Sequence, residues 1–171
     1  PNTPALLAAR DIGLRWASDG PRLVAEPGRA EVGGAFVRWQ ALSWTGGERP
    51  EARAELQLED LAAAPLMARW QPDFGWGGDL TIGARIDVRS APATSVDVVV
   101  ERAGGDLTVT DETTTGALGL TDLRLGIAAH DGVWNFTAGV AGNAFGVGSG
   151  AVVARTTRDA AWPDAATPID G

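Results

Sequence analysis

The stretch GVWNFTAGVAGNAFGVGSGAVV, residues 132–153, contains two kinds of alternation in succession. Large apolar side chains first occupy every second position, and glycines then do the same. Because side chains alternate between the two faces of a β-strand, this period of two predicts a pair of strands. Gly142-Asn143 is a two-residue turn signal, which predicts that the strands form a hairpin.

The predicted hairpin has one bulky face and one nearly bare face. On the bulky face, each large side chain meets a smaller or complementary one, in the pairs Val140–Phe145, Ala138–Val147, Phe136–Ser149 and Trp134–Ala151. On the bare face, the predicted pairs are Gly139–Gly146, Thr137–Gly148 and Asn135–Gly150.

Composition limits the class of protein. The chain has 171 residues, of which 44% are hydrophobic, with 23 glycines and 10 prolines. This composition argues against a helical protein and against disorder. The formal net charge of −8 works against binding nucleic acid or anionic surfaces by charge. The chain contains no cysteine, so it has no disulfide framework and no thiolate metal ligand.

Alternation with a period of two recurs along most of the chain. It predicts strands near residues 12–16, 22–26, 29–34, 35–44, 51–61, 79–90, 94–102, 104–110 and 120–132. In residues 35–44, the apolar positions are expected to be Val37, Trp39 and Ala41. One helical turn is expected between Glu59 and Ala64, ended by Pro65.

Roughly ten short strands joined by tight turns predict an all-β fold, an antiparallel meander with one apolar and one wet face. The apolar face must be covered by another sheet, by the same sheet curled over, or by a ligand.

The sequence offers no strong catalytic constellation. His130, the single histidine, is expected to lie on the surface, with Asp131 shaping an Asp-Gly turn. The acidic residues lie at alternating polar positions or in loops, so we expect them to be solvated. The G-x-G-x-x-A match at residues 146–151 lacks the helix that a dinucleotide site needs. We therefore expect no enzyme, no metal site and no cofactor.

Seven tryptophans, at positions 16, 39, 44, 70, 76, 134 and 162, are the more informative residues. A row of aromatic side chains on a sheet could bind sugars by stacking. However, Trp16, Trp39 and Trp134 are in phase with aliphatic neighbours, which favours core or groove lining.

Residues 65–171 resemble part of a TamB-type protein, the inner-membrane subunit of the translocation and assembly module in the wider AsmA-like (DUF490) group. The resemblance rests on ARWQPDFGWGGDLTIGARIDVRS, then VVVERAGGDLTV, then GALGLTDLRLGIAAHDGVWNFTAGVAG, in that order. Residues 10–64 fit the same pattern of short strands more loosely.

The resemblance implies an elongated antiparallel sheet curled into an open half-pipe, or β-taco, with an apolar interior. It also implies a periplasmic segment of a longer protein anchored in the inner membrane, with residues 1–171 as a single β-rich segment. Such a protein passes phospholipid acyl chains between the inner and outer membranes, or assists outer-membrane protein assembly with the TamA-type barrel. Contact with that barrel is expected through other parts of the full-length protein.

On this hypothesis, the apolar positions of the strands line a lipid groove. The candidates are Leu80, Ile82, Ile86, Val88, Val96, Val98, Val100, Leu107, Val109, Leu123, Leu125, Ile127, Trp134, Phe136 and Val140. The alternative is a closed β-sandwich acting as a secreted binding or adhesion module, because the alternation of residues is identical in the two cases.

Overall fold

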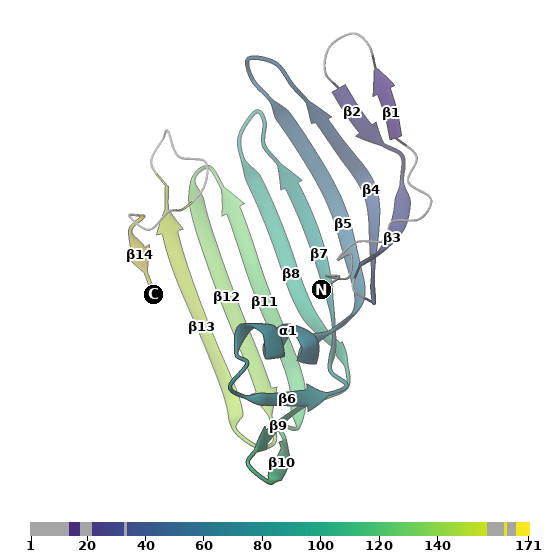
Figure 1. Cartoon of the computed structure of the whole chain (residues 1–171). Helices are drawn as coiled ribbons and strands as arrows, with labels where there is room; N and C mark the ends of the chain where they lie inside the picture. The colour runs from purple at the N-terminus through teal and green to yellow at the C-terminus, as the bar shows by residue number, and fades with distance from the viewer. Residues whose placement is uncertain (1–13, 18–21, 33, 157–162, 164–166) are drawn as a thin grey trace.

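The computed structural model describes residues 14–17, 22–32, 34–156, 163 and 167–171. Over these residues the fold is all-β, with antiparallel sheets, as the alternation predicts, and one short helix (Figure 1). In chain order the elements are β1 (Leu14–Ala17), β2 (Arg22–Ala25), β3 (Gly28–Val32), β4 (Ala35–Thr45), β5 (Glu51–Ala62), α1 (Ala63–Trp70), β6 (Gly75–Gly78), β7 (Thr81–Arg89), β8 (Ser95–Gly104), β9 (Leu107–Asp111), β10 (Thr114–Ala117), β11 (Leu120–His130), β12 (Val133–Gly142), β13 (Gly146–Arg155) and β14 (Ile169–Asp170).

Most strands form one large antiparallel sheet in the order β1-β2-β4-β5-β7-β8-β11-β12-β13-β14, with β3 also paired to β4. The sheet is neither closed nor strongly curled, so the half-pipe curvature expected from the resemblance is not confirmed. A second sheet consists of three short strands, in the order β10-β9-β6.

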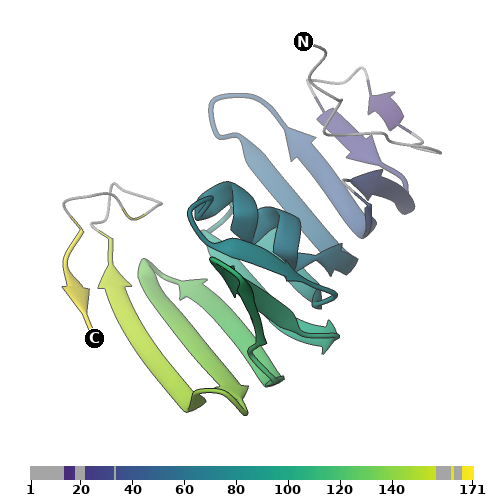
Figure 2. The same ribbon diagram turned by 60° about the horizontal axis from the view of Figure 1, so that its bottom comes forward.

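The small sheet is formed by two segments of the chain that leave the large sheet and later return to it. The chain leaves the large sheet after β5 to form α1 and β6, and leaves it again after β8 to form β9 and β10. Figure 2 shows α1 and the small sheet lying over one face of the large sheet, with strands on both sides left uncovered. We call this second layer, which consists of α1, β6, β9 and β10, the cover.

The helix differs from the sequence prediction. Residues 59–62 continue strand β5, and α1 begins only at Ala63 and runs through Pro65 to Trp70. Proline is accepted there because Pro65 lies in the first helical turn, where a backbone N–H has no partner within the helix. The predicted helical turn between Glu59 and Ala64 was therefore wrong in both bounds.

The hairpin at residues 132–153 forms, but its predicted register was wrong. The strands join through Asn143, Ala144 and Phe145, and Gly142 pairs with Gly146, whose φ of +85° suits glycine. Trp134 therefore faces Ala154 instead of Ala151. An odd shift in register moves a strand's side chains to the other face. The glycines at 148 and 150 thus share the face of the large residues, and the predicted bare face carries Val147, Ala151 and Val153.

Candidate functional site

The large sheet has one continuous apolar face, which we call the apolar face. The register aligns one row of apolar residues across six neighbouring strands, from β5 to β13: Leu56, Ile86, Val98, Ile127, Phe136 and Val152. The side chains of this row are all only partly buried. Facing residues in adjacent strands lie on the same side of a sheet, so the row forms one surface.

The cover closes one end of the apolar face. Ala63 of α1, Leu80, Leu107 and Leu120 form a buried cluster, and Met67, Ile82, Leu123 and Val140 pack against it. Two predicted groove residues, Leu80 and Leu107, therefore lie in a core between the layers, where they are 2% and 7% exposed. Val109 lies in the small sheet, opposite Trp76 and Gly116.

A second buried cluster lies at the other end of the same face. It consists of Val96, Ala129, Trp134 and Ala154, and Val88, Val98, Ile127 and Phe136 pack against it. The rings of Trp134 and Phe136 stack, with their centroids 6.2 Å apart. Trp134 was predicted to belong to the core or to line a groove. It is 4% exposed, so it belongs to the core.

Between the two clusters the face stays open. Leu125 is 42% exposed, although its neighbours in the register, Val100 and Ala138, belong to the same apolar surface. The structure brings five of the candidate groove residues, Ile86, Val98, Val100, Leu125 and Ile127, side by side on neighbouring strands.

Several residues of the apolar face were missed by the sequence analysis, including Leu56 and Val152 of the row. Leu42 and Trp44, which are 40% and 41% exposed, continue the apolar face onto β4. A β-bulge between Trp39 and Ala41 shifts the alternation, so Ala41 leaves this face and Leu42 joins it. The Leu-x-Trp spacing at 42–44 is the sequence signal that could have found them.

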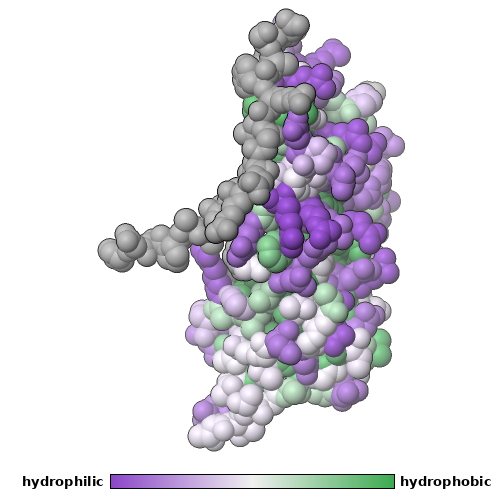
Figure 3. Space-filling view, turned by 90° about the vertical axis from the view of Figure 1, so that its right-hand side faces the viewer, coloured by the Kyte–Doolittle hydropathy of each residue, from purple (hydrophilic) through white to green (hydrophobic). Residues whose placement is uncertain are grey.

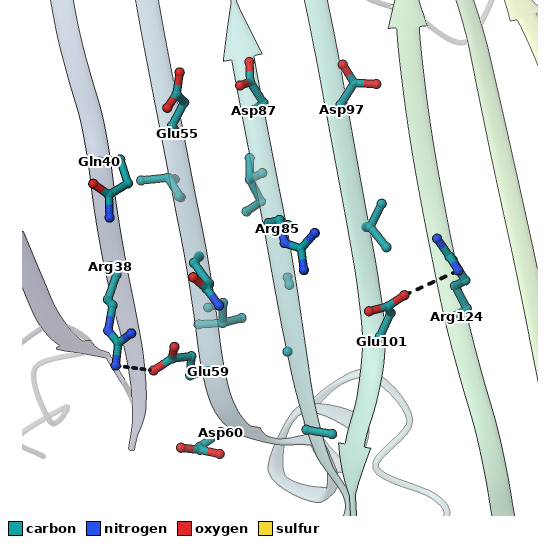
Figure 4. Close-up of a pocket in the computed structure, with 18 of the residues that line it drawn as sticks. Arg38, Gln40, Glu55, Glu59, Asp60, Arg85, Asp87, Asp97, Glu101 and Arg124 are labelled. Carbon is teal, nitrogen blue, oxygen red and sulfur yellow. Dashed lines mark ion pairs between the residues drawn. The ribbon is translucent and has the colours of Figure 1, made fainter.

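The opposite face of the large sheet is charged, and we call it the polar face. Figure 4 shows a shallow groove there, lined by acidic residues and arginines from β4 to β11. Its ion pairs include Arg38–Glu59 at 3.1 Å and Arg124–Glu101 at 3.5 Å. Figure 3 views the molecule from the edge that carries β1 and β2, and hydrophilic residues cover much of the upper right-hand side of this view.

Arginines offset a row of carboxylates on the polar face. Glu55, Asp87 and Asp97 lie directly opposite one another on β5, β7 and β8. Arg53 donates hydrogen bonds to Glu55, which lower the pKa of the Glu55 carboxyl and raise the pKa of the Arg53 guanidinium. Arg89 lies 3.4 Å from Asp87. The carboxylates therefore lie on the solvated face, as expected from the sequence, and form ion pairs there.

His130 has partners that the sequence did not reveal. Its Nδ1 lies 3.2 Å from Ser95 Oγ, and its Nε2 lies 3.1 Å from Asp97 Oδ1. The side chains of His130 and Asp97 are 54% and 50% exposed. Charge stabilisation at such an exposed position is weak because water screens it. The predicted surface location of His130 is confirmed, and the trio is best described as a polar cross-strand contact.

Asp106 ties the cover to the large sheet. Its carboxylate accepts hydrogen bonds from the backbone N–H groups of Leu107, Gly119 and Leu120, at 2.8–2.9 Å. These bonds, led by that from Leu120, lower the pKa of Asp106. The Asp106 carbonyl accepts further bonds from the N–H groups of Asp79 and Leu80. One residue thus fixes the points where β7, β9 and β11 begin.

Neither a metal centre nor a membrane helix is found among the residues described. No group of three or more His, Cys, Asp or Glu side chains in that part of the chain could hold a metal ion. No helix there is both long enough and apolar enough to cross a membrane.

No protein-family model, curated protein or solved structure matches this chain. The candidate site is therefore assigned from its geometry alone, and it is the open middle of the apolar face.

Proposed function

We propose that the chain binds lipid acyl chains on its apolar face, as a conduit segment of a longer, TamB-type periplasmic protein. The observation that carries this proposal is the open middle of the apolar face, where Leu125 is 42% exposed beside Val100 and Ala138, on a sheet whose other face is charged. Soluble proteins rarely leave a contiguous apolar surface uncovered without a partner for it.

The dimensions suit an acyl chain. Neighbouring strands lie about 4.8 Å apart, so a row across six strands is about 24 Å long. One leaflet of a bilayer is about 15 Å deep, half of a hydrocarbon core of about 30 Å. Each buried CH₂ group contributes about 0.8 kcal/mol. An extended acyl chain lying across the strands would therefore gain enough free energy to stay bound.

The chemistry of the face favours an acyl tail over a charged headgroup. Its open middle, around Val100, Leu125 and Ala138, consists of apolar side chains, and Arg85 and Arg124 nearby point to the polar face. Arg102, the next residue along this side of β8 after Val100, donates its guanidinium hydrogen bonds to the Gly105 carbonyl. The chain carries a net charge of −8, which repels anionic headgroups. Binding along this face needs no catalytic step, in keeping with the expectation that the protein is not an enzyme.

Lipid retention by the purified chain tests this function. The chain is incubated with phosphatidylethanolamine vesicles and separated from them, and the retained phospholipid is measured by mass spectrometry. We expect Leu125→Asp to reduce the retained lipid several-fold, because it places a charge in the middle of the apolar face. The matched control is Thr137→Asp, which adds the same charge at an exposed position on the polar face.

Circular dichroism shows whether both variants fold. Equal lipid retention by folded Leu125→Asp and folded Thr137→Asp would contradict the proposal. So would a wild-type chain that retains no phospholipid at all.

A further inference from the structure

One end of the polar face carries a pair of arginines that face each other. The register places Arg53 of β5 directly opposite Arg89 of β7, and Ser43 of β4 continues the same row. Like charges in this arrangement normally destabilise a sheet. Both arginines form their ion pairs with Glu55 and Asp87, which lie two residues nearer the middle of the sheet.

A recess borders this row. Its volume is about 450 Å³, and its lining comes from β2, β4, β5, β7 and the turn that follows β7. The lining residues are Arg22, Ser43, Thr45, Glu51, Ala52, Arg53, Arg89 and Ala91. We call it the arginine recess, because three arginines and one glutamate give its lining a formal charge of +2, in a chain whose net charge is −8.

The arginine recess holds hydrogen-bond donors that are not used within the described residues. Arg22 is exposed and forms no ion pair with them, and the hydroxyl groups of Ser43 and Thr45 form no hydrogen bond with them. Arg53 donates to Glu55 from Nε and one Nη atom. A guanidinium has five N–H donors, so Arg53 keeps others for a ligand.

We propose that the arginine recess binds the phosphate group of a phosphate monoester. Such a group carries a charge of about −1.5 to −2 at pH 7 and three strong acceptor oxygens. Its charge therefore matches the formal +2 of the lining. Guanidinium groups bind phosphate oxygens in a bidentate manner and stay charged at any physiological pH. A carboxylate ligand would match the lining less well, because it carries a single charge and two oxygens.

This inference goes beyond the binding of acyl chains and does not rest on it, because the arginine recess lies on the polar face. The net charge of −8 opposes the long-range attraction of anions. Binding therefore depends on the short-range contacts inside the recess. Salt should weaken it, since the arginines are solvent-exposed.

An NMR titration of the isotope-labelled chain with inorganic phosphate tests the proposal, with chloride at the same ionic strength as the reference. We expect saturable shifts at the backbone amides of the recess, including those of Thr45 and Ala52. Arg22→Gln should raise the Kd for phosphate about tenfold or more, because it removes charge-assisted hydrogen bonds. Arg85→Gln is the matched control. It also removes an exposed polar-face arginine that has no ion pair among the described residues, but Arg85 lies outside the recess.

Three results would overturn the proposal. They are a wild-type chain without saturable phosphate binding, an Arg22→Gln chain that binds like the wild type, and equal weakening by Arg85→Gln. Circular dichroism confirms that both variants are folded.

Two phosphate monoesters then distinguish the source of the ligand. Glycerol 3-phosphate is soluble, whereas phosphatidic acid in phosphatidylcholine vesicles presents the same group on a lipid surface. Binding of glycerol 3-phosphate that is weakened by Arg22→Gln would support a soluble ligand. Binding of the vesicles alone, weakened in the same way, would support a lipid headgroup. Binding of neither probe would overturn the assignment to phosphate monoesters.

Discussion

At the scale of single residues, glycines with different surroundings have different roles. A Cβ atom on Gly28 would lie 2.5 Å from Trp39 Cζ2, and Trp39 is 5% exposed. A Cβ on Gly139 would meet nothing within 4 Å, and Gly139 does not have a positive φ. The first glycine is needed for a close approach to a buried ring, and the second is not.

Gly28→Ala should therefore destabilise the protein by about 1–3 kcal/mol, because the added methyl group forces the Trp39 ring to move. Gly139→Ala should leave stability unchanged or raise it by up to about 1 kcal/mol, because alanine lowers the entropy of the unfolded chain. Urea unfolding of both variants measures this difference. Equal losses in stability would argue against the packing of Trp39 on β3.

Asp106 makes stability depend on pH. Its pKa in the folded protein lies below the ordinary value of 3.8, so the ionised carboxylate stabilises the folded state. The contribution is complete above the unfolded-state pKa and is lost as the pH falls through the lower folded-state pKa.

Asp106→Asn should lower the melting temperature near pH 7, because a neutral amide accepts fewer hydrogen bonds than a carboxylate. Thermal unfolding at a series of pH values measures the gap in melting temperature between the variant and the wild type. The gap should narrow as the pH falls below the ordinary value of 3.8, since the wild-type carboxyl then becomes protonated. A gap that stays constant down to low pH would contradict this role for the carboxylate.

At the scale of elements, the cover divides the predicted groove residues into two kinds. Leu80 is 2% exposed between the two layers, whereas Leu125 is 42% exposed on the open middle of the apolar face. The same type of residue therefore stabilises the fold at one position and stays available to a ligand at the other.

Leu80→Ala should cost about 2–5 kcal/mol of unfolding free energy, because it leaves a cavity in the core between the layers. Leu125→Ala should cost about 1 kcal/mol or less, since much of this side chain is already in water. Urea unfolding compares the two variants. Similar costs would mean that Leu125 also belongs to a closed core.

The positions of the strands could be predicted from the sequence more accurately than the register in which the strands pair. The alternation in residues 79–90, 94–102 and 120–132 placed Ile86, Val98 and Ile127 on one face, because bulky apolar and charged residues mark the two sides of these strands. In residues 146–151, glycine and other small residues do not distinguish the two sides of the strand. The predicted register therefore depended on the turn alone, and the turn is longer than predicted.

The candidate site was only partly visible in the sequence. The bulge beside Trp39 depends on the pairing of β4 with β5, so it could not be read from β4 alone, and Leu42 and Trp44 were missed. The cover is built from two segments that are distant in the sequence and contact each other only in the folded chain. The burial of Leu80 and Leu107 beneath it was therefore not predicted either.

At the scale of the whole molecule, the large sheet separates two environments. The polar face is charged and solvated, and the apolar face has a buried cluster at each end and exposed side chains in its middle. A closed sandwich would need a second sheet of comparable size, but the small sheet has only three short strands. This asymmetry is the feature of the described residues on which the proposed binding of acyl chains rests.

Site-specific photocrosslinking to phospholipid tests the central claim most directly. A photoreactive phenylalanine is placed at Leu125 or at its neighbour Arg124, which are both exposed but face opposite sides of β11. The folded chain is then irradiated with labelled phospholipid vesicles. Binding on the apolar face predicts lipid adducts at position 125 and few at position 124. Equal labelling at the two positions, or no adduct at position 125, would contradict the account.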